Sequence, residues 1–173
     1  IKKKQINFGP ISTFSSFAIV SENRVFLKPA KMSKVEAVMY GCATPTGAGM
    51  VINQLKEIKK THKICLIGVG GVGMAALLAL KKKRCEIFIV EKNKNKQNFL
   101  KKFNVKVIKS ENINNYKNYF DFCIETSGTV NMIEYGFDLI NKTGKLIFAS
   151  HPKNFKNISI NPHDLISGKK IYG

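Results

Sequence analysis

The sequence predicts an α/β fold, a parallel sheet covered on both faces by helices. From residue 63 onward, short and almost continuously apolar segments alternate with longer segments of helical character. Strands that are apolar throughout are buried on both faces, as happens when helices cover both sides of a parallel sheet. A chain of 173 residues can bury roughly 70% of its unfolded surface, so neither a disulfide nor a metal is needed to stabilise the core.

Each element of this sheet can be placed along the chain. The expected strands span residues 63–68, 86–91, 105–109, 120–125 and 144–149. The expected helices span residues 71–83, 94–103 and 129–141, with Gly144 stopping the last of them. Pro162 suits the first turn of a short helix that ends near Gly168, because proline has no N–H to lose there.

The N-terminal residues follow a different pattern. Residues 13–29 alternate like two short strands, which cannot form a fold alone. We therefore expect residues 1–32 to be the edge of a mostly missing domain and residues 33–173 to form the α/β domain. The chain starts at Ile1 and stops at Gly173 as a new extended segment begins, so both ends are expected to be cut.

Between these parts the sequence predicts two helices. Ser33 can cap the first helix, with Glu36 at the reciprocal position of a capping box. Residues 41–49 are expected to break this helix, and a second helix should run to about Ile58.

The first predicted strand runs into the glycine motif Gly68-Val69-Gly70-Gly71-Val72-Gly73, followed by an apolar helix. Gly68 allows a tight turn, Gly70 lets the backbone approach a pyrophosphate, and Gly73 lets the helix pack closely on its strand. The helix N-terminus adds free N–H groups and the positive end of its dipole. Strand, glycines and helix in this order predict a Rossmann domain that binds a dinucleotide.

The second predicted strand ends on a carboxylate, Glu91, eighteen residues after Gly73. A carboxylate at this spacing can accept hydrogen bonds from both ribose hydroxyls of the adenosine half of a dinucleotide. It would repel the 2′-phosphate of NADP, so NAD is the expected cofactor. The alternative is a solvated acid at the end of a strand.

The amino-acid composition restricts the kinds of partner that the chain is expected to bind. The net charge is +18, but it comes from 27 Lys and only 2 Arg, whereas nucleic-acid sites favour the planar fork of Arg. We therefore expect no nucleic acid. The four cysteines are scattered and none forms a CxxC pair, which suits a reducing cytoplasm. No apolar stretch reaches the roughly 18 residues of a membrane span, and a signal peptide is not expected.

Four stretches together resemble the coenzyme-binding domain of the zinc-dependent alcohol dehydrogenases, the medium-chain dehydrogenase/reductase family. The likeness covers residues 12–173. The stretches are Gly41-Cys42-Ala43-Thr44-Pro45-Thr46-Gly47, Gly68-Val69-Gly70-Gly71-Val72-Gly73, Asp121-Phe122-Cys123-Ile124-Glu125-Thr126-Ser127-Gly128, and Asn157-Ile158-Ser159-Ile160-Asn161-Pro162 with Leu165-Ile166-Ser167-Gly168.

The resemblance implies a Rossmann fold, a doubly wound parallel sheet of six strands with its cofactor at the switch point of the strand order. Cys42 matches one of the family's catalytic zinc ligands. From the residues alone, a small buried residue at a helix end is the favoured interpretation, because a single cysteine does not make a metal site. The family's other two zinc ligands, a Cys and the His of a Gly-His-Glu motif, lie upstream of this position in the family. No Gly-His-Glu motif occurs in this sequence, and no catalytic residue is assigned to this chain. The implied cofactor-binding residues are Thr46, Gly68, Gly70, Gly71, Val72, Gly73, Glu91, Lys96, Ser127, Gly128, Ala149 and Ser150.

Several of these assignments have alternatives. Thr46 is implied beside the nicotinamide ring, but it could simply start a helix. Lys96 is implied near the adenosine ribose, but it could be solvated like its neighbours. Ser150 and His151 replace smaller residues of the family, which puts the fit of the nicotinamide in doubt. His151 is not expected to act as a general base, because the family supplies its proton relay elsewhere.

The resemblance implies the NAD-binding portion of a zinc-type alcohol or polyol dehydrogenase, which transfers hydride between an alcohol and a nicotinamide. The full-length enzyme would hold zinc, act on an alcohol or aldehyde and form a homo-oligomer in the cytoplasm, whereas this chain alone would be inactive. Two alternatives stay open. One is a nucleotide-sensing Rossmann regulatory module, and the other is a zinc-free quinone- or enoyl-type reductase of the same superfamily.

Overall fold

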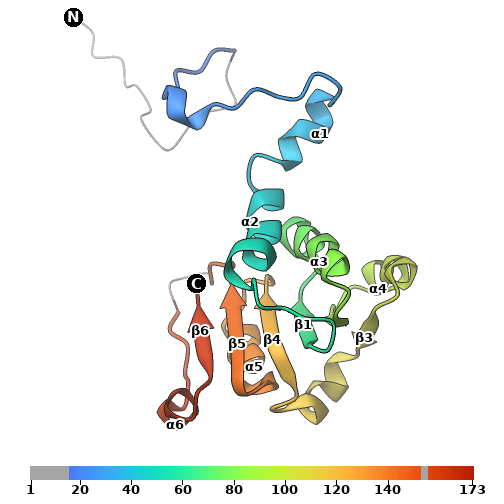
Figure 1. Ribbon diagram of the computed structural model, residues 1–173, viewed down its shortest axis with the longest axis vertical. Coiled ribbons are helices and arrows are strands. Elements are labelled where there is room, and N and C mark those ends of the chain that lie inside the picture. Colours follow the sequence, from blue (N-terminus) through green and yellow to red (C-terminus); the bar gives the residue numbers. More distant parts are fainter. Residues whose placement is uncertain (1–15, 153–155) are drawn as a thin grey trace, which may run out of the picture. The chain divides into compact units, whose positions relative to one another are not determined.

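The structure is a computed structural model that describes residues 16–152 and 156–173 (Figure 1). The chain divides into two compact units, Ile1–Ala37 and Val38–Gly173. Each unit is described here by itself. The domain boundary expected after residue 32 stays a prediction.

The described part of the first unit contains helical turns only. A single 3-10 turn, η1 (Glu22–Arg24), lies where two strands were expected, and no strand forms between residues 16 and 33. The strand prediction is therefore wrong for these residues; residues 13–15 lie outside the described ones. A strand needs a neighbour to take up its N–H and C=O groups, and alternation of side chains cannot provide one.

The expected capping box forms at the start of α1 (Lys34–Met39). The Ser33 N–H donates to a carboxylate oxygen of Glu36 at 2.8 Å, and the Glu36 N–H donates to the Ser33 hydroxyl at 3.2 Å. The helix start at Ser33 is confirmed.

The second unit is built on one parallel sheet of six strands in the order β3-β2-β1-β4-β5-β6, and every neighbouring pair is parallel. The first three strands run outward in one direction, and β4 then returns to the other side of β1. This confirms the doubly wound fold. The strands are β1 (Lys63–Ile67), β2 (Glu86–Val90), β3 (Lys106–Ile108), β4 (Phe120–Glu125), β5 (Ile140–Phe148) and β6 (Lys170–Tyr172).

Helices connect these strands close to the expected positions. They are α2 (Ala43–Gly49), η2 (Met50–Gln54, a π-helical turn), α3 (Gly71–Lys83), α4 (Lys94–Leu100), η3 (Lys101–Phe103), η4 (Ser110–Tyr116), α5 (Val130–Leu139) and α6 (Pro162–Ile166). The 3-10 segment η4 was not expected from the sequence.

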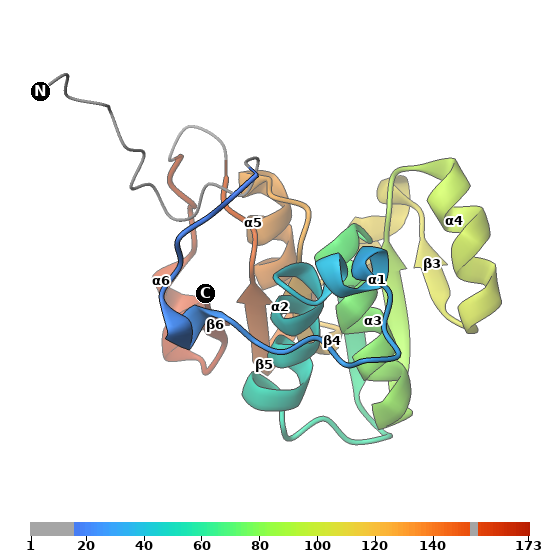
Figure 2. The ribbon, with the colours of Figure 1, turned by 90° about the horizontal axis from the view of Figure 1, so that it is seen from above.

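Two hydrophobic clusters, one on each face of the sheet, form the core. One joins α3, η2 and α4 to alternate residues of the strands, including Leu77, Leu66 and Ile124. The other joins α5 to the opposite residues, including Phe137, Ile67 and Cys123. Figure 2 shows α5 on one side of the sheet and α2 and α3 on the other. Successive residues of each strand thus face the two clusters in turn, which explains why the strands are apolar along their whole length.

Two boundaries differ from the sequence prediction. The predicted break of the first helix does occur, since α1 ends at Met39 and residues 40–42 form turns, but it is shorter than the expected 41–49. The second helix already begins at Ala43 and continues through η2 to Gln54, short of the expected Ile58. The strand β5 begins at Ile140, because Ile140 already pairs with Phe120 before an irregularity in the register; regular pairing resumes at Lys145. Within the described residues, no helix is both long and apolar enough to cross a membrane.

Candidate nucleotide-binding site

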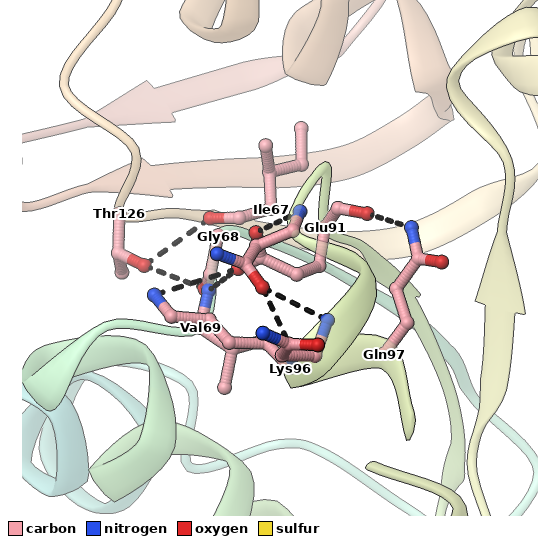
Figure 3. Close-up of polar contacts among 9 residues, drawn as sticks. Ile67, Gly68, Val69, Glu91, Lys96, Gln97 and Thr126 are labelled. Atoms are coloured by element: carbon pink, nitrogen blue, oxygen red, sulfur yellow. Dashed lines mark hydrogen bonds and ion pairs between the residues drawn. The ribbon is translucent and has the colours of Figure 1, made fainter. Parts of the chain in front are cut away.

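The glycine loop connects β1 to α3. Gly68 has a φ of +82°, in the left-handed region that suits glycine, and its N–H donates to the Val90 carbonyl oxygen at 2.9 Å. Gly70 is the N-cap of α3, and its carbonyl accepts the Met74 N–H at 2.8 Å. The Thr126 hydroxyl, at the end of β4, lies 2.9 Å from the Gly68 carbonyl oxygen and can donate to it (Figure 3). The loop is therefore held by both strands that neighbour β1.

The glycines of this loop differ in the space around them. A Cβ added to Gly73 would lie 2.2 Å from the Gly68 carbonyl oxygen and 2.7 Å from the Thr126 hydroxyl oxygen, so a side chain cannot fit. A Cβ added to Gly70 would meet no heavy atom within 4 Å, although its backbone has an ordinary φ of −85°. The protein leaves open space at Gly70, and neither strain nor packing explains a glycine there.

Glu91 follows β2 and holds the loop from the other side. It is buried, and one carboxylate oxygen accepts the Val69 N–H at 3.0 Å (Figure 3). The other oxygen accepts the Asn93 N–H at 2.9 Å. The solvated-acid alternative is therefore wrong, because both oxygens are engaged by the protein. Each oxygen has two lone pairs, so each can still accept one further hydrogen bond.

Lys96 lies beside this carboxylate on the first turn of α4. Its ammonium nitrogen is 3.9 Å from a Glu91 oxygen, and its side chain is 49% exposed. Asn93 caps the helix by accepting the N–H groups of Asn95 and Lys96, and the Gln97 amide donates to the Glu91 carbonyl oxygen. The turn after β2 is thus ordered around Glu91.

The ends of β4 and β5 contain a polar cluster that sequence reasoning missed. Glu125, the last residue of β4, is 0% exposed. One of its oxygens accepts the Ser127 N–H at 2.6 Å and the Ser127 hydroxyl, and the other accepts the Ser150 hydroxyl. The sequence contains one signal of this cluster, since Glu125 ends an apolar strand and Ser127 follows two residues later. Gly128, with a φ of +81°, turns the chain away at this point.

Thr46 lies in α2 and lines a pocket of about 300 Å³ together with Ala149, after β5. The other walls come from the rest of α2, the π-helical turn η2, the end of β5 and Gly173. This pocket lies at the carboxyl edge of the sheet, where ligands bind in folds of this kind.

Cys42 is exposed and is the N-cap of α2, so the expectation of a buried thiol there is wrong. No group of three His, Cys, Asp or Glu side chains within metal-binding distance occurs in residues 16–152 and 156–173. One thiolate does not satisfy a four-coordinate ion, so the described donor set does not fit a catalytic zinc.

The structure brings the expected cofactor-binding residues together in three groups. The glycine loop, Glu91 and Lys96 form the first, Thr46 and Ala149 the second, and Ser127, Gly128 and Ser150 the third. The first group follows β1 and β2, and the other two lie near the ends of β4 and β5.

No family model matches the chain. It is 26% identical to an S-(hydroxymethyl)glutathione dehydrogenase of Komagataella pastoris over 96% of its length, and 23% identical to one of Photobacterium damsela subsp. piscicida over 91%. The chain spans about half of these relatives, 48% and 46% of their lengths.

Solved structures show the same likeness. Benzyl alcohol dehydrogenase from Acinetobacter calcoaceticus superimposes with a TM-score of 0.83 and 26% identity, over 93% of this chain and 47% of that one. An alcohol dehydrogenase zinc-binding domain protein from Burkholderia ambifaria shares the fold, with a TM-score of 0.68 and 23% identity over 76% of this chain and 38% of that one. By sequence and by fold, the chain resembles the zinc-type alcohol dehydrogenases, at modest identity, over its coenzyme-binding region.

Proposed function

We propose that the chain binds NAD(H) and supplies the coenzyme-binding part of an alcohol dehydrogenase-like oxidoreductase. The observation that supports this most strongly is the open space at Gly70, between two glycines that are closely packed. A pyrophosphate against Gly70 would meet the N-terminus of α3, whose first N–H groups have no partner within the helix. Bound there, the cofactor would supply a nicotinamide that accepts or donates hydride.

Each implied residue has a role in this proposal. The glycine loop, with Gly71 and Val72 in the first turn of α3, faces the pyrophosphate. Glu91 accepts the adenosine ribose hydroxyls through its remaining lone pairs, and Lys96 lies beside them. Thr46 and Ala149 line the pocket in which the nicotinamide would lie, with Ser127, Gly128 and Ser150 at its ribose side.

Glu91 also sets the cofactor preference in this proposal. Its carboxylate is held in place by the Val69 and Asn93 N–H groups and cannot swing away from a ligand at low cost. A 2′-phosphate would place two like charges side by side, which favours NADH over NADPH.

The substrate class follows from the relatives. Two are S-(hydroxymethyl)glutathione dehydrogenases and one is a benzyl alcohol dehydrogenase, so we propose a small-molecule alcohol or aldehyde substrate. Cytoplasmic location and homo-oligomer formation belong to the same proposal. These relatives support an enzyme over a nucleotide-sensing regulatory module. A zinc-free quinone- or enoyl-type reductase of the same superfamily is the second candidate, because Cys42 by itself is compatible with either kind of enzyme.

Calorimetric titration of the purified chain with NADH and NADPH tests the proposal. We expect one NADH per chain and weaker binding of NADPH. Equal or tighter NADPH binding would refute the role of Glu91 and point to the neighbouring lysines. Absence of binding by both cofactors would refute the function itself.

A further inference from the structure

Glu125 is a fully buried carboxylate that the proposed function does not use. Burying a charge is expensive unless hydrogen bonds replace the lost water. Three donors do so here, the Ser127 N–H and the hydroxyls of Ser127 and Ser150. No cation forms an ion pair with Glu125 in the part of the chain that the structure describes. The carboxylate is therefore satisfied almost wholly by two serines from different loops.

These two loops lie side by side at the edge of the sheet. Glu125 pairs in register with Phe148, and its carbonyl oxygen accepts the Ala149 N–H at 3.2 Å. A Cβ added to Gly128 would lie 3.8 Å from the Ser150 Cβ. Ser127 is exposed and Ser150 half-buried, so a ligand can reach both residues although Glu125 is closed off. Ala149, next to Ser150, already lines the pocket beside α2.

The buried acid decides the direction of the hydrogen bonds at this edge. A hydroxyl has one hydrogen to donate and two lone pairs to accept with, whereas a carboxylate only accepts. Both serine hydrogens are committed to Glu125, so toward a ligand each hydroxyl oxygen can only accept. Serines without such a partner could rotate and accept or donate equally well.

We propose that Glu125 is a positioning residue that fixes Ser127 and Ser150 as acceptors for an N–H or O–H donor on the nicotinamide half of the coenzyme. Two groups of that half carry such donors, the carboxamide NH₂ and the ribose hydroxyls. The inference rests on the proposed function, and it assigns specific side-chain contacts to Ser127 and Ser150.

Calorimetric titration of the wild type and three variants with NADH, ADP-ribose and AMP tests this. Ser150→Ala removes one acceptor, Ser150→Thr keeps the hydroxyl, and Ser167→Ala removes an exposed serine elsewhere as the matched control. We expect Ser150→Ala to weaken NADH binding by about tenfold, the loss of one hydrogen bond, and to leave AMP unchanged. Ser150→Thr and Ser167→Ala should bind all three ligands like the wild type.

The ligands separate the two donor groups. If ADP-ribose weakens together with NADH, the ribose hydroxyl is the partner; if NADH alone weakens, the carboxamide is. Either result supports the proposal. The proposal would be overturned if the ratio of NADH affinity to AMP affinity were the same in Ser150→Ala as in the wild type. A purely structural cluster would not alter that ratio. A wild type that binds none of the ligands would instead overturn the proposed function.

Glu125→Gln tests the positioning role directly. The glutamine amide donates to one serine, whose hydrogen then turns toward the ligand, so the acceptor pattern is lost although the shape is kept. We expect a loss in NADH affinity at least as large as in Ser150→Ala, with AMP binding retained. An unchanged NADH to AMP ratio would overturn the role of Glu125. Should this variant not fold, the comparison of Ser150→Ala with Ser150→Thr still decides the proposal.

Discussion

Replacing Gly70 by valine should abolish NADH binding without destabilising the fold. A Cβ at this position would meet nothing within 4 Å, and a φ of −85° is open to any residue. The side chain would therefore project into the space where we place the pyrophosphate. We expect NADH affinity to fall by at least about 100-fold, or about 2.7 kcal/mol.

Gly73 provides the opposite case in the same loop. Here even the single methyl group of Gly73→Ala would lie 2.2 Å from the Gly68 carbonyl oxygen, a backbone atom that cannot turn aside. Overpacking of this kind costs about 3 kcal/mol. In a chain of this size each 1 kcal/mol lowers Tm by about 2–4 °C, so Tm should fall by about 6–12 °C. The smaller substitution should thus be the more damaging to stability.

Thermal unfolding by circular dichroism and calorimetric titration with NADH measure both quantities on both variants. The expected pattern is Gly70→Val with wild-type Tm and no binding, and Gly73→Ala with a lowered Tm. Retained NADH affinity in Gly70→Val would refute the placement of the pyrophosphate. A large drop in its Tm would show that the space at Gly70 is not open.

Four further predictions follow from the same geometry. Glu91→Ala should relax the preference for NADH over NADPH, because it removes roughly 1–3 kcal/mol of charged hydrogen bonding from the NADH side. Cys42, which is exposed, should react with a thiol reagent in the folded chain, whereas the buried Cys65 and Cys123 should react only on unfolding. Burial raises the pKa of the Cys123 thiol well above its usual range. Above about pH 8.5 the unfolded chain therefore binds fewer protons than the folded one, and the free energy of unfolding should fall as the pH rises. The dialysed chain should hold no stoichiometric zinc and oxidise no alcohol, since Cys42 has no partner ligands among the described residues.

Three of these predictions would be contradicted by the following results. An unchanged cofactor preference in Glu91→Ala would mean that the ribose does not contact the carboxylate. Equal labelling rates of all thiols would show that the sheet opens on the time scale of the reaction. One tightly bound zinc per chain, or turnover above background, would show that the chain contains a metal site outside the described residues or one that forms on binding.

Much of the fold could be predicted because it depends on local signals. The helix α3 matches its predicted range of 71–83, since the glycine motif fixes its start and a run of lysines its last turn. The strand β4 likewise matches 120–125, because a short apolar run before a helical segment has few alternative structures. The parallel sheet followed from the alternation of strands and helices, whereas the sixth strand and the switch point in the strand order came from the family resemblance.

The errors occurred where tertiary contacts decide the structure. The break expected over residues 41–49 ends already at residue 42, although three glycines and a proline lie in this range. Gly47 lets α2 lie against α3, because a Cβ there would come within 2.0 Å of the Val72 carbonyl oxygen. The start of β5 at Ile140 depends on its pairing with Phe120 across an irregular register. Both contacts join segments that are far apart in the sequence, so a local sequence pattern does not reveal them.

Glu91 shows why a site residue can be located from sequence while its full role cannot. Spacing alone placed it at the end of β2, on the correct edge of the sheet. The structure adds that its two oxygens bridge the Val69 and Asn93 N–H groups, so one side chain orders both the glycine loop and the turn before α4. A change at Glu91 therefore alters the shape of the site as well as its charge. For this reason even Glu91→Gln does not isolate the charge, because its NH₂ group would face the Val69 or the Asn93 N–H and keep only one of the two hydrogen bonds, whereas Glu91→Ala loses both.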